Sequence, residues 1–101
     1  MAVTMIYSDN TKLATELVTA ARLFGPDVFG VSINDDEQTR ALTATGIDVL
    51  KINRNDLCQA DTGAVAWALK QAADKVNAEI ILLSSDRSGK ELTGRLAQIM
   101  E

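Results

Sequence analysis

The 101-residue sequence predicts a three-layer, Rossmann-like α/β fold, in which helices cover both faces of a parallel sheet. Short apolar segments alternate four times with longer segments of helical period, which is typical of consecutive β–α units. The first and fourth apolar segments are the richest in aliphatic residues and should lie centrally, whereas Lys51 places the third at an edge. With right-handed crossovers, these features predict the strand order 3-2-1-4.

The first two units have clear boundaries. A strand over residues 3–7 precedes a helix that stops at the Gly-Pro pair 25–26. The apolar stripe of this helix is formed by Leu13, Leu17, Ala20, Ala21 and Phe24. The second strand is expected over residues 27–33. The polar segment 34–37 should then supply an N-cap and an acidic first turn for a helix reaching Gly46.

The last two units differ in the length of their loops. A third strand is expected over residues 48–52, and the polar loop 53–61 separates it from a helix over residues 62–78. The four aliphatic residues 80–83 predict a strand buried on both faces. The loop 84–89 follows, and then a helix whose apolar stripe is formed by Leu92, Leu96, Ile99 and Met100.

This strand order leaves one edge of the fourth strand without a neighbour. The segment 80–83 contains no Pro and no charge, and Glu79 precedes it. Unpaired backbone groups on an apolar strand promote association. We therefore expect either that the chain belongs to a longer polypeptide or that a partner covers this edge. A second copy in a homo-oligomer is one such partner.

Composition argues against several classes of function. The net charge of −4, without a cluster of Lys and Arg, does not favour a nucleic-acid partner. No apolar run reaches the roughly 18–20 residues of a membrane helix, and the N-terminus lacks the features of a secretory signal. Cys58 is the only cysteine, which fits a reducing, cytoplasmic setting.

The absence of His narrows the chemistry further. It excludes His-based catalytic triads and His-ligated metals, and a single Cys excludes thiolate clusters within the chain. We therefore predict no catalytic residue and no metal site, and an enzyme is less expected than a carrier or binding protein. The acidic residues 35–37 are interpreted as a helix start, because catalytic carboxylate pairs need a shaped pocket.

The carboxyl ends of the first and fourth strands form the expected ligand crevice. The strand order reverses between these two strands, and open parallel sheets bind ligands at such a point. Helix N-termini there offer free N–H groups to anions. The candidate binding residues on the two loops are Ser8, Asp9, Ser85, Ser88, Gly89 and Lys90.

These residues also have structural interpretations. The segment 84–91 fits a phosphate-binding P-loop poorly, because Ser84 replaces its first Gly and Glu91 replaces the hydroxyl residue after Lys90. Ser88 and Glu91 instead have the spacing of a capping box. Asp9 has the chemistry to cap the first helix. The sequence leaves capping and ligand binding open for both loops.

Two residues are candidates for contacts with a partner. Trp67 lies roughly 200° around its helix from Val65, on the side away from the apolar arc. It faces either a partner or the loop 53–61. Arg95 lies about 60° from Leu92, beside the apolar stripe of the last helix. There it is an interface residue, an ion-pair partner or a surface residue whose stem rests on the core.

The order of these features resembles the N-terminal domain of the α subunit of electron transfer flavoproteins. The positions that match the family's strand, Ser-containing loop and helix are Ser85, Ser88, Gly89, Lys90, Leu92, Arg95, Leu96 and Ala97. The segments TAARLFG and ALTATGIDVLKI are also similar to parts of that domain. The resemblance covers nearly all of residues 1–101, which are read as a single domain, and rests on order and spacing rather than on one strict motif.

The resemblance implies a flavoprotein that pairs with a β subunit and relays electrons from dehydrogenases. It also implies that FAD is held mainly by a C-terminal domain, which is expected to be absent from residues 1–101, and AMP by the β subunit. This domain would then be the scaffold and subunit-interface part of the carrier, with AMP as a further candidate ligand.

A stand-alone nucleotide-binding module of the universal-stress type is the alternative function. The resemblance implies a fold that is related to that type. However, the glycine-rich phosphate motif of the universal-stress type is not present, because Gly89 and Gly94 are spaced differently.

Overall fold

The computed structural model describes residues 3–54, 62–84 and 87–100, with side chains of the last segment described from 89 to 98. Strands and helices alternate through these segments, as predicted. The strands are β1 (Thr4–Tyr7), β2 (Val28–Ile33), β3 (Asp48–Ile52) and β4 (Ile80–Leu83). The helices are α1 (Thr11–Ala21), α2 (Asp36–Ala44), α3 (Thr62–Val76) and α4 (Arg87–Met100).

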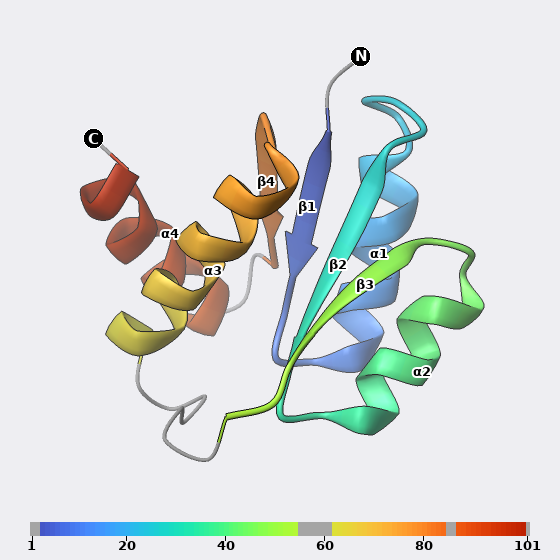
Figure 1. Cartoon of the computed structure of the whole chain (residues 1–101), viewed down its shortest axis with the longest axis horizontal. Helices are drawn as coiled ribbons and strands as arrows, with labels where there is room; N and C mark the ends of the chain where they lie inside the picture. The colour runs from blue at the N-terminus through green and yellow to red at the C-terminus, as the bar shows by residue number, and fades with distance from the viewer. Residues whose placement is uncertain (1–2, 55–61, 85–86, 101) are drawn as a thin grey trace.

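The strands form one parallel sheet in the order β3-β2-β1-β4. In β1, Met5 is aligned with Phe29 of β2 on one side and with Ile81 of β4 on the other. Figure 1 shows α1 and α2 on one face of the sheet and α3 and α4 on the opposite face. The predicted fold class and strand order are therefore confirmed.

The alternation of side chains along β1 produces two separate apolar layers. Ile6 packs with Val18 of α1 and Leu42 of α2. Met5 and Tyr7 point to the opposite face, where the buried residues contributed by α3 and α4 are Val65, Ala66, Ala68, Leu69, Ala72, Ala73, Leu92 and Leu96. Because helices cover both faces, a central strand of this sheet needs apolar residues at successive positions.

β4 departs from the prediction of a strand buried on both faces. All of its residues are only half-buried, whereas every residue of β1 is buried. The aliphatic content of β4 suggested a central position, but the strand lies at an edge of the sheet. Its side chains stay partly exposed because a neighbouring strand shields them on one side only.

The end of α1 also differs from the prediction. The helix finishes at Ala21, and the next N–H groups bond back three residues, from Leu23 to Ala20 and from Phe24 to Ala21. These tighter bonds turn the chain out of the helical path. Phe24, predicted on the apolar stripe of α1, is consequently 53% exposed.

The start of α2 agrees with the prediction. The Asp35 side chain is the N-cap and accepts from the N–H of Gln38 at 3.0 Å. Asp36 and Glu37 form the acidic first turn, where their negative charges interact favourably with the positive end of the helix dipole. Past the end of α2, Gly46 has a φ of +92°, a conformation that side-chain-bearing residues rarely adopt.

The start of α4 corrects the expected capping box. The helix begins at Arg87, so Ser88 and Gly89 belong to its first turn rather than to the preceding loop. Ser88 is therefore inside the helix and is not its N-cap. The sequence placed this boundary too late because the segment 84–89 is polar and its apolar stripe begins only at Leu92.

Candidate functional site

The loops after β1 and β4 meet, as the strand order predicts. Ser8 follows β1, Ser84 follows β4, and both side chains are buried. The Ser8 hydroxyl donates to the Ser84 hydroxyl at 3.1 Å, and it accepts from the backbone N–H of Asn10 at 3.1 Å. The floor of the predicted crevice is therefore a hydrogen-bonded junction between the two loops.

Gly89 brings α4 directly against this junction. A Cβ added to Gly89 would lie 1.8 Å from the carbonyl oxygen of Ser84 and 2.9 Å from its Oγ. The Thr93 hydroxyl donates to the Gly89 carbonyl at 2.8 Å within the same helix. Close packing thus explains the glycine here without a ligand, although the sequence also identified Gly89 as an anion-binding candidate.

The other residues of the predicted crevice lie around this junction or outside the described part of the chain. Asp9 is exposed, and the cap of α1 is Asn10, whose side chain accepts from the N–H of Leu13 at 3.1 Å. The prediction that Asp9 caps this helix is therefore wrong. Lys90 is exposed on α4. Ser85 and the side chain of Ser88 lie outside the described residues.

Gln38 connects the second β–α unit to the junction and was not among the predicted site residues. Its side chain is 1% exposed, and its amide nitrogen donates to the Ser8 carbonyl oxygen at 2.8 Å. The Oε1 atom has no hydrogen-bond partner among the described residues. The signal in the sequence is its position four residues before Leu42, on the buried stripe of α2.

Tyr7 lies at the end of β1, just before the junction, and is 4% exposed. Burial raises the pKa of its phenol above the ordinary value of 10.0, and the carboxylates of Asp9 and Asp35 raise this pKa further. Both effects disfavour a negative charge on the phenol oxygen. The phenol therefore remains protonated well into the alkaline range.

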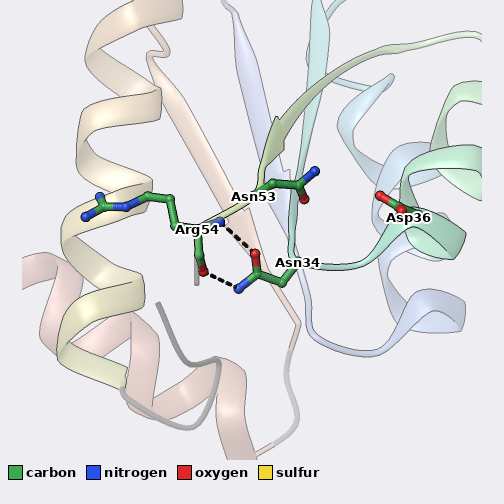
Figure 2. Close-up of a pocket in the computed structure, with 4 residues that line it drawn as sticks. All are labelled: Asn34, Asp36, Asn53 and Arg54. Atoms are coloured by element: carbon green, nitrogen blue, oxygen red, sulfur yellow. Dashed lines mark hydrogen bonds between the residues drawn. The ribbon is translucent and has the colours of Figure 1, made fainter. Parts of the chain in front are cut away.

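A polar hollow of about 590 Å³ lies beside the carboxyl ends of β2 and β3, and Figure 2 shows its lining residues. The side-chain amide of Asn34 donates to the Arg54 carbonyl at 2.9 Å and accepts from the Arg54 N–H at 2.8 Å. This pairing joins the two strand ends. The Arg54 side chain extends away from Asp36 and toward α3 (Figure 2).

An ion pair connects α2 to β3 beside this hollow. Lys51 Nζ lies 2.7 Å from Asp36 Oδ1, and the hydrogen bond and charge of Lys51 lower the pKa of the Asp36 carboxyl. Lys51 therefore occupies the edge position that its charge predicted. Asp36 is the one carboxylate among the described lining residues.

The two predicted interface residues are both on the surface. Trp67 is 55% exposed and points away from the core, as its helical spacing predicts. The loop residues 55–61, which were the alternative cover for Trp67, lie outside the described part of the chain. Arg95 is exposed on α4. Contact with a partner stays a prediction for both side chains.

Two further properties concern the described ranges 3–54, 62–84 and 87–100. Within them, His, Cys, Asp and Glu residues form no group of three or more that could hold a metal ion. None of the helices there combines the length and the apolar character needed to cross a membrane.

Comparison with known protein families matches residues 7–101 to the family described as "Electron transfer flavoprotein domain". The matched range begins at the last residue of β1 and includes all later strands and helices. Neither the comparison with curated proteins nor the comparison with solved structures gives a match. The family match agrees with the resemblance identified from the sequence.

Proposed function

The chain belongs to the electron transfer flavoprotein domain family, and from this premise we propose that it is a scaffold and subunit-interface domain of a flavin-dependent electron carrier. In this proposal the domain positions a partner subunit and does not itself hold the redox group. The partner is the β subunit of the carrier or a second copy of this chain, and dehydrogenases supply the electrons.

The observation that carries this proposal is the open edge of β4. Four aliphatic residues of β4 are half-buried, and β1 is the one strand beside them in the described sheet. The Ile80 N–H donates to the carbonyl of Val3, the residue before β1, so Ile80 directs its backbone groups toward β1. Because successive residues of a strand direct their backbone groups to opposite edges, the N–H and C=O groups of Ile81 and Leu83 point to the open side.

The geometry of the β1–β4 junction supports a structural rather than a flavin-binding role. Ser8 and Ser84 are engaged with each other, and Gly89 packs against the Ser84 backbone without room for one added carbon atom. These contacts explain the described residues of the junction without a flavin, and we propose that another domain or subunit of the carrier holds it.

The exposed residues of α3 and α4 extend the proposed interface. A tryptophan that is 55% exposed belongs to the residue types enriched in the energetically dominant part of protein interfaces. Arg95 lies on α4, the helix that packs against both β4 and α3. We propose that Trp67 and Arg95 contact the same partner that covers β4.

The molecular mass in solution tests the proposal. The purified chain, alone and mixed with an electron transfer flavoprotein β subunit, is examined by sedimentation equilibrium. We expect an assembly larger than one chain in at least one of the two samples. A monomer in both samples, with fast hydrogen exchange at Ile81 and Leu83, would refute the interface assignment.

A matched pair of variants locates the interface. Ile80 is half-buried and belongs to neither core cluster, so Ile80→Lys introduces a charge at the edge with little change in packing. A lysine on an edge strand opposes strand association. We expect Ile80→Lys to abolish the assembly. The control, Asp48→Lys on the opposite edge strand β3, should leave it intact.

A further inference from the structure

A groove of about 250 Å³ lies between β3 and α3, on the sheet edge opposite to β4. Its walls are apolar where the strand and the helix face each other, at Leu50 and Ile52 of β3 and at Ala68 and Ala72 of α3. The alanines are the physical reason for the groove. Their short side chains leave space above the two half-buried β3 residues.

Positive charge borders this groove at both ends. Arg54 follows the carboxyl end of β3, and Lys75 lies in the last turn of α3. Because the helix of a β–α–β crossover runs antiparallel to its strands, Lys75 lies near the amino end of β3. The described lining residues include no carboxylate, although the chain as a whole has a net charge of −4.

The backbone of β3 offers hydrogen-bonding groups along the same groove. The Ile52 carbonyl accepts from the Asn34 N–H at 2.7 Å, so Ile52 directs its backbone groups toward β2. Successive residues of a strand direct their N–H and C=O groups to opposite edges. The N–H and C=O groups of Val49 and Lys51 therefore point to the open side, where the described sheet has no further strand.

We propose that this groove binds an extended, acidic segment of a partner protein, which adds to β3 as a further strand. The segment carries one apolar side chain, which enters the groove between the alanines, and a carboxylate two residues to either side of it, facing Arg54 and Lys75. Main-chain hydrogen bonds provide affinity in such strand addition, and the side-chain pockets provide specificity. The proposal is independent of what covers β4.

Size and charge both favour this occupant. The groove volume of about 250 Å³ is below the roughly 300–1,000 Å³ of small-molecule sites, so it suits a side chain rather than a cofactor. The charged side chains among the described lining residues of the groove are all basic, so they favour an acidic segment over a basic one.

The first experiment measures binding of the fluorescein-labelled peptide Thr-Glu-Thr-Leu-Thr-Glu-Thr by fluorescence anisotropy. In a strand, its Glu, Leu and Glu side chains share one face. The matched peptide Thr-Lys-Thr-Leu-Thr-Lys-Thr keeps the apolar anchor and reverses the charge. We expect binding of the acidic peptide, weakening with added salt. Equal binding of the two peptides, or no binding of the acidic one, would overturn the proposal.

A charge series at Gln71 tests the groove from the protein side. Gln71 is an exposed lining residue of α3, so its substitution should not disturb the fold. We expect Gln71→Lys to tighten binding of the acidic peptide about twofold to fivefold, and Gln71→Glu to weaken it by a similar factor. The same substitutions at Gln98, exposed on α4, form the control. Equal effects at both positions would contradict the assignment.

Hydrogen exchange then distinguishes the two edges of the sheet. Binding of the acidic peptide should slow exchange of the Val49 and Lys51 amides, because these donors become paired. Slowing at Ile81 and Leu83 instead would place the peptide on β4 and would overturn the proposal. This result is separate from the assembly measurements, which compare Ile80→Lys on β4 with Asp48→Lys on β3.

Discussion

The substitution Gly89→Ala should destabilise the protein strongly, because the added methyl group has no space. Its Cβ would lie 1.8 Å from the Ser84 carbonyl oxygen and 2.7 Å from the carbonyl carbon, both of them backbone atoms. A backbone neighbour cannot rotate away, so α4 must move from β4 by more than an ångström. Overpacking of this kind costs about 1–3 kcal/mol, and we expect the upper end of that range.

The same substitution at Gly94 provides the control within the same helix. A Cβ on Gly94 would meet no atom within 4 Å, and alanine is favoured over glycine in a helix interior by about 0.5–1 kcal/mol. We therefore expect Gly94→Ala to stabilise the protein and Gly89→Ala to destabilise it. The free energy of unfolding of each variant is measured by urea titration. An unchanged m-value would show that the variant differs from the unmodified protein in stability alone.

The opposite signs separate close packing from ligand binding at Gly89. If Gly89→Ala unfolds at the same urea concentration as the unmodified protein, α4 does not approach Ser84 as described. If that variant keeps its stability and loses binding of an anion, the glycine serves a ligand. Either result would refute the reasoning from the structure.

Three further predictions concern the junction and its surroundings. Ser8→Ala and Ser84→Ala should each lower the free energy of unfolding by about 1–3 kcal/mol. The double variant should lose less than the sum of the two single losses, because the residues share one hydrogen bond. Strictly additive losses in urea denaturation would contradict this. Since the pKa of Tyr7 is raised on folding, the unfolded chain ionises first, and stability should fall as the pH rises above about 10. Tyr7→Phe should reduce this loss, and the tyrosinate absorbance of the only Tyr should appear later in folded than in urea-unfolded protein. AMP and FAD should leave the melting temperature unchanged. A ligand that binds the folded protein would add about 2.7 kcal/mol to the free energy of unfolding at about 100 times its Kd. Such a stabilisation would support the nucleotide-binding alternative.

Local sequence patterns were sufficient for most of the fold. The alternation of apolar and helical segments determined the parallel sheet, and the predicted bounds of β3 and β4 agree with the structure. Lys51 indicated an edge because a charge on a central strand would be buried. Asp35 indicated a helix start because its carboxylate satisfies a backbone N–H locally. Such interactions involve residues close in sequence and can be read from spacing.

The candidate site was less predictable because its contacts join residues far apart in the chain. Asp9 and Asn10 are both chemically able to cap α1, and the path of the loop selected Asn10. Gln38 resembles an ordinary polar helix residue until the fold places it beside the Ser8 carbonyl. The burial of β4 was also overestimated, because aliphatic content does not distinguish an edge strand from a central one.

The sequence by itself determined the α/β class, the strand order and the family, because periodicity and the order of motifs are properties of the chain. Only the tertiary structure decided that Gly89 is a packing residue, since this depends on the distance between α4 and the Ser84 backbone. The groove between β3 and α3 was likewise invisible in the sequence. It exists because Ala68 and Ala72 face the uncovered side of an edge strand, a relation that only the packing of helix against sheet creates.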